Sequence, residues 1–145
     1  MRAIVIIDNN NGLGVNNTLP FRFKSDMLHF REKTLNNTVV MGRKTFESLP
    51  RVLDKRDPIV LSRDYNIKSV PNNAWIIGGS IVYKAFEHLI TEFYITHVNG
   101  VFQADTFLKN DLSKYQKEVI KEVYDKNLLD NQYYNLLFIR YFKKM

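Results

Sequence analysis

The sequence contains no cysteine, no long apolar run, and no group of histidines and acids at metal-ligand spacing. The absence of cysteine excludes disulfides and thiol catalysis, and the missing ligand pattern argues against a metal site. No apolar run is long enough to span a bilayer. The N-terminus is apolar for only five residues before Asp8, which predicts a buried strand and not a signal peptide. We therefore expect a cytoplasmic protein that does not bind membranes.

The composition is that of a globular protein with an excess of basic residues. The 145 residues are 45% hydrophobic and 13% aromatic, which predicts a single domain spanning residues 1–145. The net charge is +6, from 21 basic and 15 acidic residues. The basic residues are scattered, apart from the short Lys143-Lys144 tail, so the charge favours anionic small ligands over nucleic acid.

Short buried-strand patterns alternate with helical segments and are followed by a hairpin pattern. The expected helices run from Ser25 to about Thr34, from Gly42 to Ser48, and from about Ser80 to about His88. This order predicts an α/β three-layer sandwich with a central, mixed, mostly parallel sheet and a C-terminal antiparallel hairpin. The expected strands are residues 3–7, 38–41, 58–62, 74–77, 92–98, 116–124 and 133–142.

The segment around Asp26 carries the first candidate site residue. Ser25 is a good N-cap, and Asp26 lies in the first helical turn, where the helix dipole favours an acid. At helical spacing Asp26 shares a face with the apolar residues Met27 and Phe30. Two interpretations follow: an ordinary first-turn acid, or a buried acid that holds a polar ligand.

Three further segments have ligand-binding and structural interpretations of similar weight. The turn-rich loop over residues 9–18 is either a lid or a long surface connection. Gly42 is followed by basic residues at a strand-to-helix corner, as in a phosphate site or an ordinary helix start. Gly78 and Gly79 admit either a ligand against the main chain or a tight turn.

Taken together, seven motifs in register over nearly the whole chain resemble dihydrofolate reductase. They are Gly-Leu-Gly with Leu-Pro-Phe, Asp26 before Phe30, Val-Met-Gly-Arg-Lys-Thr-Phe-Glu-Ser-Leu, Val-Leu-Ser-Arg, Ile-Gly-Gly-Ser-Ile-Val-Tyr, Tyr-Ile-Thr-His, and Ala-Asp-Thr. The resemblance implies reduction of dihydrofolate to tetrahydrofolate, with NADPH as the cofactor, and binding of antifolate inhibitors. Hydride transfer between two flat rings requires a dry site with apolar walls and an acid.

By the family pattern, Asp26 grips the 2-amino group and ring N3 of the pterin. The Thr96 hydroxyl would bond the Asp26 carboxylate and, through water, the pterin. Leu19 and Phe21 would complete the catalytic set. An isolated acid in an apolar wall is expected to have its pKa raised above about 4, which would place an inflection in the pH–rate profile.

The resemblance also implies residues that bind the substrate and its tail. The folate slot would be lined by Ile4, Val5, Met27, Phe30 and Leu49. Arg56 would pair with the α-carboxylate of the glutamate tail, since a guanidinium suits a carboxylate. Without the family resemblance, Arg56 would be interpreted as a solvated arginine in a loop.

The cofactor residues implied by the resemblance come from several segments. Arg43, Ser62 and Arg63 would lie nearest the adenosine 2′-phosphate, and Asp105 would hold the lid, residues 14–19, closed. The peptide that links Gly78 and Gly79 would be cis. The full set is Ile6, Leu13, Gly14, Gly42, Arg43, Lys44, Thr45, Leu61, Ser62, Arg63, Ile77, Gly78, Gly79, Ser80, Ile81, Val82 and Tyr83.

Several positions depart from the family pattern. Phe21 stands where the family most often has tryptophan, so no indole N–H can fix a water beside Asp26. Val5 and Ile6 are bulkier than the usual residues. Ala104 replaces a common glycine. The connection from Ser62 to Trp75 is shorter by about one strand and one short helix, which weakens the wall expected around the adenine.

Two other functions remain open beside a monomeric, NADPH-dependent reductase of dihydrofolate. One is reduction of a ribosylated pyrimidine in flavin synthesis by an enzyme of the same fold. The other is a non-catalytic module, structural or binding folate or a nucleotide, derived from the enzyme. Asp26 and Thr96 argue against the non-catalytic module. Competition between the two substrates would distinguish the pyrimidine reductase from a reductase of dihydrofolate.

Overall fold

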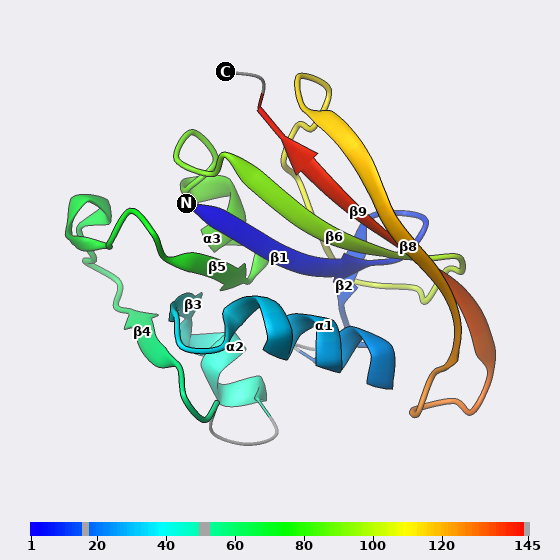
Figure 1. Ribbon diagram of the computed structural model, residues 1–145. Helices are drawn as coiled ribbons and strands as arrows, with labels where there is room; N and C mark the ends of the chain where they lie inside the picture. Colours follow the sequence, from blue (N-terminus) through cyan, green and yellow to red (C-terminus); the bar gives the residue numbers. More distant parts are fainter. Residues whose placement is uncertain (16–17, 50–52, 144–145) are drawn as a thin grey trace.

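The computed structural model describes residues 1–15, 18–49 and 53–143, and a seven-stranded sheet organises them (Figure 1). The four strands β4, β3, β5 and β1 are parallel to one another, and β6 is parallel to β1. The hairpin strands β9 and β8 complete the sheet in antiparallel orientation. In spatial order the strands are β4 (Asp57–Leu61), β3 (Thr38–Gly42), β5 (Trp75–Gly78), β1 (Arg2–Ile7), β6 (Glu92–Val98), β9 (Tyr133–Phe142) and β8 (Gln116–Lys126).

The central position of β1 explains its apolar sequence. Every residue from Ala3 to Ile7 is buried, because β1 has a neighbour on both edges and packing on both faces. The uninterrupted run of apolar residues, without alternation, is what a strand covered on both sides requires. The buried first strand that the sequence predicts is thereby confirmed.

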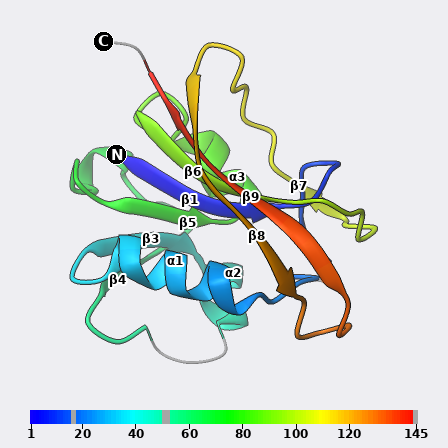
Figure 2. The same ribbon diagram turned by 45° about the vertical axis from the view of Figure 1, so that its right-hand side comes forward.

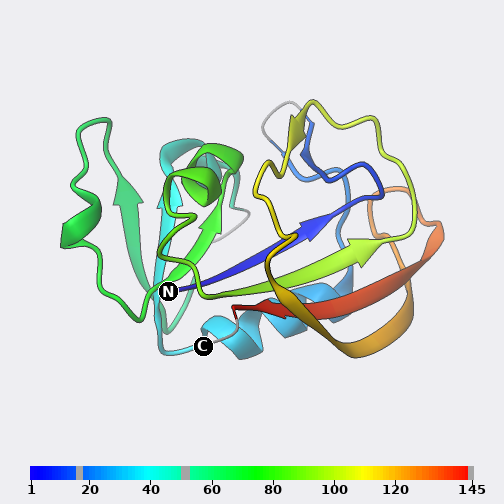
Figure 3. The ribbon, with the colours of Figure 1, turned by 90° about the horizontal axis from the view of Figure 1, so that it is seen from above.

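The helices lie on both faces of the sheet, as the expected three-layer sandwich requires. They are α1 (Lys24–Thr34), α2 (Arg43–Ser48) and α3 (Ser80–Ala85). Seen from above, α1 and α3 lie on opposite sides of the sheet (Figure 3). On its inner face α1 buries His29, whose ring meets the Phe138 ring edge-on at 4.9 Å between centroids.

The start of α1 differs from the expectation that Ser25 caps it. The helix begins at Lys24, and Phe23 is the N-cap without a side-chain hydrogen bond. Asp125 of β8 accepts instead from the backbone N–H of Ser25 at 3.0 Å and from its hydroxyl at 2.6 Å. A carboxylate from a distant strand therefore satisfies the helix N-terminus. Figure 2 shows the hairpin of β8 and β9 reaching this end of α1.

Three short features were not expected from the sequence. The strands β2 (Gly12–Gly14) and β7 (Thr106–Phe107) form a second, two-stranded sheet, and a 3-10 turn spans Ile67–Ser69. Helix α3 ends at Ala85 and not near His88, because the chain turns to bury Phe86 and Ile90 before β6. Within the described residues, no helix is long and apolar enough to cross a membrane.

Candidate active site

A hydrogen bond joins the two residues expected at the centre of the site. The Thr96 hydroxyl donates to Oδ1 of Asp26 at 2.7 Å. Asp26 comes from the first turn of α1, and Thr96 from the buried strand β6, in register with Ile6 of β1. The fold thus brings a carboxylate from one layer against a hydroxyl of the central sheet, 70 residues away in the chain.

Burial gives Asp26 an unusual protonation behaviour. Asp26 is half-buried, and the loss of hydration around its carboxyl group raises its pKa from 3.8 to about 6. The hydrogen bond from Thr96 acts in the opposite direction, because it stabilises the carboxylate. Of the two interpretations of Asp26, the structure therefore favours the buried acid over an ordinary first-turn acid.

Tyr83 is the third polar group close to this pair. Its hydroxyl donates to the backbone carbonyl of Ile4 at 2.7 Å, and the residue is buried. Burial first, and then the nearby charge of Asp26, raise the pKa of Tyr83 above its ordinary value. Tyr83 therefore stays a neutral donor, and it fixes α3 to the middle of β1.

The apolar residues expected to line the folate slot divide into three groups. Ile4 belongs to one cluster with Ile77, and Phe30 and Leu49 pack against that cluster. Val5 points to the opposite face of the sheet, where it joins the main core, as alternation along a strand requires. Met27 is exposed on α1. The structure thus brings Ile4, Phe30, Leu49 and Ile77 together, and it does not bring the Val5 side chain to them.

Phe21 and Leu19 occupy different environments. Phe21 is fully buried in a second cluster with Ile6, and the Phe102 ring meets it edge-on at 5.1 Å between centroids. Leu19 is exposed. Phe21 therefore acts as a core residue that supports the segment before α1, with no polar atom to offer a ligand.

Two strand ends converge where the cofactor phosphates were expected. Gly78 and Gly79 are joined by a cis peptide bond, as the resemblance implied. A Cβ atom placed on either glycine would lie 3.4 Å from the Thr45 hydroxyl, and one placed on Gly42 would lie 3.4 Å from Val82. Gly78 also has φ +129°, which L-residues rarely adopt. The residues fit a cofactor that approaches bare backbone at this sheet edge.

The register of β3 and β4 places the expected 2′-phosphate residues side by side. Gly42 at the end of β3 pairs with Leu61 at the end of β4. The residues that come next in the chain, Arg43 and Ser62, therefore lie at neighbouring strand ends. Arg43, Lys44, Ser62 and Arg63 are exposed, whereas Leu61 packs against the main core. Two arginines therefore follow neighbouring strand ends, an arrangement that suits a phosphate monoester.

The expected lid is held by backbone pairing. Gly14 pairs with Thr106, and the Asp105 N–H donates to the Gly14 carbonyl at 2.9 Å. Leu13 packs against the main core. Residues 16 and 17 of the expected lid lie outside the described residues. A backbone contact thus joins Asp105 to the described part of the lid.

Asp8 is a supporting residue whose contacts the sequence analysis did not predict. It is buried, and its carboxylate accepts from the backbone N–H groups of Asn10, Gly12 and Phe102 at 2.9, 2.7 and 3.0 Å. These bonds tie the loop before β2 to the loop after β6. An acid at a strand end followed by an Asn-rich turn was the available signal, since such residues bond backbone two residues on.

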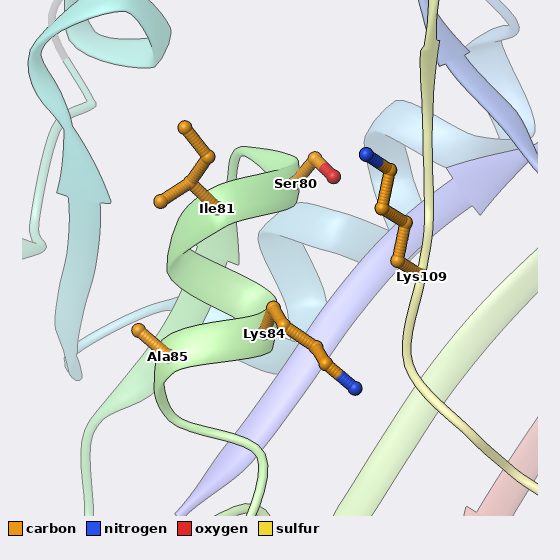
Figure 4. A pocket seen from close by; sticks show the side chains of 5 residues that line it. All are labelled: Ser80, Ile81, Lys84, Ala85 and Lys109. Atoms are coloured by element: carbon orange, nitrogen blue, oxygen red, sulfur yellow. The ribbon is translucent and has the colours of Figure 1, made fainter.

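The first two side chains of α3, directly after the glycine pair, contact β7 or solvent. The Ser80 hydroxyl donates to the Phe107 carbonyl at 2.5 Å, and Ile81 is 83% exposed. Both residues line a hollow of about 410 Å³ with Ala85 and two lysines, Lys84 and Lys109 (Figure 4). The structure thus places the side chains of Ser80 and Ile81 at a surface hollow beside two lysines.

Arg56 is not the solvated loop arginine that the sequence alone, without the family resemblance, would predict. Its side chain is only 4% exposed. The guanidinium lies over the Phe30 ring, 5.7 Å from the centroid, and its Nη1 donates to the Thr34 hydroxyl at 3.2 Å. The structure therefore places the arginine beside an aromatic residue of the expected folate slot.

Within the described ranges, no group of histidines and acids is arranged to hold a metal ion.

Known proteins resemble this chain along nearly its whole length. A family model described as dihydrofolate reductase matches residues 1–143. The dihydrofolate reductase of Mycoplasma genitalium is 33% identical, covering 84% of this chain and 89% of that protein. That of Buchnera aphidicola subsp. Baizongia pistaciae is 30% identical, covering 89% and 87%. A structure of dihydrofolate reductase from Enterococcus faecalis complexed with NADP(H) and RAB-propyl has a TM-score of 0.79 at 28% identity, covering 99% and 96%.

Proposed function

The chain belongs to the dihydrofolate reductase family, and on that premise we propose which of its residues carry out the family's reaction. The reaction is the reduction of 7,8-dihydrofolate to 5,6,7,8-tetrahydrofolate with NADPH. The observation that supports the assignment most is the hydrogen-bonded pair of Asp26 and Thr96, in which a carboxyl group has a pKa of about 6.

Asp26 anchors and polarises the pterin. A carboxylate can accept from both the 2-amino group and ring N3, and such paired charge-assisted bonds fix the ring plane. Thr96 restrains the carboxyl group on its other side. When bound, NADPH supplies a hydride to C6 of the pterin. The reaction also consumes a proton at N5, and a carboxyl group that titrates near pH 6 can help to supply it at neutral pH.

The apolar and basic residues position the two ligands. Ile4, Phe30 and Leu49 form one wall for the pterin and its aromatic extension. Gly78 and Gly79 expose backbone to the cofactor phosphates, and Arg43 carries charge to the 2′-phosphate. The same pterin site accepts antifolate inhibitors. We further propose that residues 1–145 act as a single-domain, monomeric enzyme of the cytoplasm.

Turnover with defined substrates tests the proposed function. We expect loss of NADPH absorbance in the near ultraviolet when dihydrofolate is added, and none with a ribosylated pyrimidine. Tight folate binding without turnover would favour the non-catalytic module. Turnover of the pyrimidine alone would favour the flavin-pathway enzyme.

Replacing Thr96 by valine tests the restraint on Asp26. The change removes a hydrogen bond to a charged group, which contributes about 1.5–3 kcal/mol, so we expect kcat/KM to fall by about tenfold to 100-fold. It also removes the influence that lowers the pKa of Asp26, so the inflection in the pH–rate profile moves above pH 6. Thr38→Val, the same change at the start of β3, should leave both quantities unaltered.

Replacing Arg43 by alanine tests the cofactor assignment. One charge-assisted bond to a phosphate contributes about 1.5 kcal/mol or more, so the KM for NADPH should rise about tenfold. The KM for NADH, which has no 2′-phosphate, should change little. Lys117→Ala on the distant strand β8 removes the same charge and serves as the control. An equal rise for both cofactors would contradict the role of Arg43 at the 2′-phosphate.

A further inference from the structure

A three-membered charge cluster lies beside Phe30. The carboxylate of Asp54 accepts from Arg31 through both oxygens, at 2.6 Å from Nη1 to Oδ1 and 3.1 Å from Nη2 to Oδ2. Oδ1 also accepts from Nη2 of Arg56 at 3.3 Å. The side chains of Arg31 and Asp54 are 42% and 60% exposed, whereas that of Arg56 is 4% exposed. Asp54 therefore covers the guanidinium assigned above to the substrate tail.

Arg56 is fixed in place independently of the Asp54 carboxylate. Its Nε donates to the backbone carbonyl of Asp54 at 3.0 Å, and Nη1 donates to Thr34. The flanking backbone is tied to the turn after α1, since Asn36 N–H donates to the Lys55 carbonyl at 2.7 Å. Loss of the Asp54 charge should thus leave Arg56 where it is. Of the five N–H donors on a guanidinium, two remain for a ligand.

The Asp54 carboxylate is held more strongly by Arg31 than by Arg56. The two contacts with Arg31 form a bidentate pair, the strongest arrangement for these groups, whereas the contact with Arg56 is single and long. Hydrogen bonds from Arg31 lower the pKa of Asp54 to about 2, so the carboxylate is charged throughout the working pH range. An incoming carboxylate could replace the contact with Arg56 while Arg31 keeps Asp54.

We propose that Asp54 is an internal competitor that sets how strongly this site binds a ligand with a tail carboxylate. Its negative charge offsets one of the two arginines, and it lies within hydrogen-bond distance of the guanidinium that would bind the tail. This inference rests on the proposed role of Arg56 in the reduction of dihydrofolate. Asp54 is a specificity-determining residue, because only ligands with an anionic tail meet its charge.

The test compares substrates with and without the tail in Asp54→Asn, which keeps the size of the side chain. We expect the KM for dihydrofolate to fall about threefold to tenfold, the effect of removing one like charge a few ångströms away in a solvent-exposed setting. The KM for 6-methyl-7,8-dihydropterin, which has no tail, should change less than twofold. The effect should shrink at 0.5 M salt, because salt screens exposed charges.

Glu122→Gln on the edge strand β8 is the matched control, because it removes one exposed carboxylate far from Arg56 along the sheet. An unchanged or higher KM for dihydrofolate in Asp54→Asn would overturn the inference, and equal changes for both substrates would also overturn it. Dissociation constants of folate and 6-methylpterin, measured by titration calorimetry, make the same comparison without turnover. The ratio of the two constants should change in Asp54→Asn in the direction expected for the two KM values. A protein that shows the ratio but no turnover would contradict the proposed reaction and leave the role of Asp54 supported.

Discussion

Replacing Asp26 by asparagine lowers kcat for dihydrofolate at pH 7 by about 100-fold or more. The expected loss follows from the position of the carboxyl group, which the Thr96 hydroxyl holds at 2.7 Å in a half-buried site. An amide neither carries the charge that polarises the pterin nor titrates near neutrality, and a positioned acid or base contributes about 10²–10⁴-fold to such reactions. Stopped-flow or steady-state loss of NADPH absorbance measures the effect.

The matched control for this variant is Asp57→Asn, which makes the same substitution at an exposed residue at the start of β4. We expect its kcat to stay within twofold of the unaltered protein. Unchanged kcat in Asp26→Asn would show that another group performs the chemistry. A change in the KM for dihydrofolate alone would reduce Asp26 to a binding residue.

The same substitution stabilises the ligand-free protein at neutral pH. Moving the pKa of Asp26 from 3.8 in the unfolded chain to about 6 in the folded one corresponds to at most about 3 kcal/mol. Because the folded state holds this proton more tightly, its stability falls as the pH rises from about 4 to 6, and the full penalty is present above pH 6. Asparagine carries no charge and avoids that penalty.

Urea unfolding at pH 4 and pH 8 measures this effect. We expect Asp26→Asn and the unaltered protein to have nearly equal free energies of unfolding at pH 4, and the variant to be more stable by up to about 3 kcal/mol at pH 8. Asp64→Asn, at an exposed carboxylate, should show no such divergence. A variant that is less stable than the unaltered protein at pH 8 would contradict burial as the cause of the raised pKa.

Local patterns in the sequence were enough to predict the elements that carry the reaction. The apolar run of β1 and the paired glycines after β5 each reflect a requirement of the nearby backbone: burial on both faces for β1, and a conformation open to glycine at Gly78. The family register then assigned Asp26 and Thr96 to one site before any contact between them was known, and the structure brings them into contact.

Contacts that depend on distant segments could not be predicted in this way. The cap of α1 comes from Asp125, which is 100 residues beyond Ser25. The strands β2 and β7 have three and two residues, too few to show a period. The ion pairs of Asp54 depend on how the loop before β4 returns to α1, and no local signal in the sequence marks such a return.

The pH dependence of turnover tests the role of Asp26 most directly. NADPH oxidation would be followed from pH 4.5 to 9 in the unaltered protein and in Asp26→Asn, at saturating NADPH and at dihydrofolate concentrations well below KM. The rate then gives kcat/KM, which reports the pKa values of the enzyme before dihydrofolate binds. Because the reaction consumes a proton, we predict that the rate of the unaltered protein falls as the pH rises through an inflection near 6, and that the variant lacks this inflection. Absence of turnover at every pH, or the same inflection in Asp26→Asn, would contradict the account.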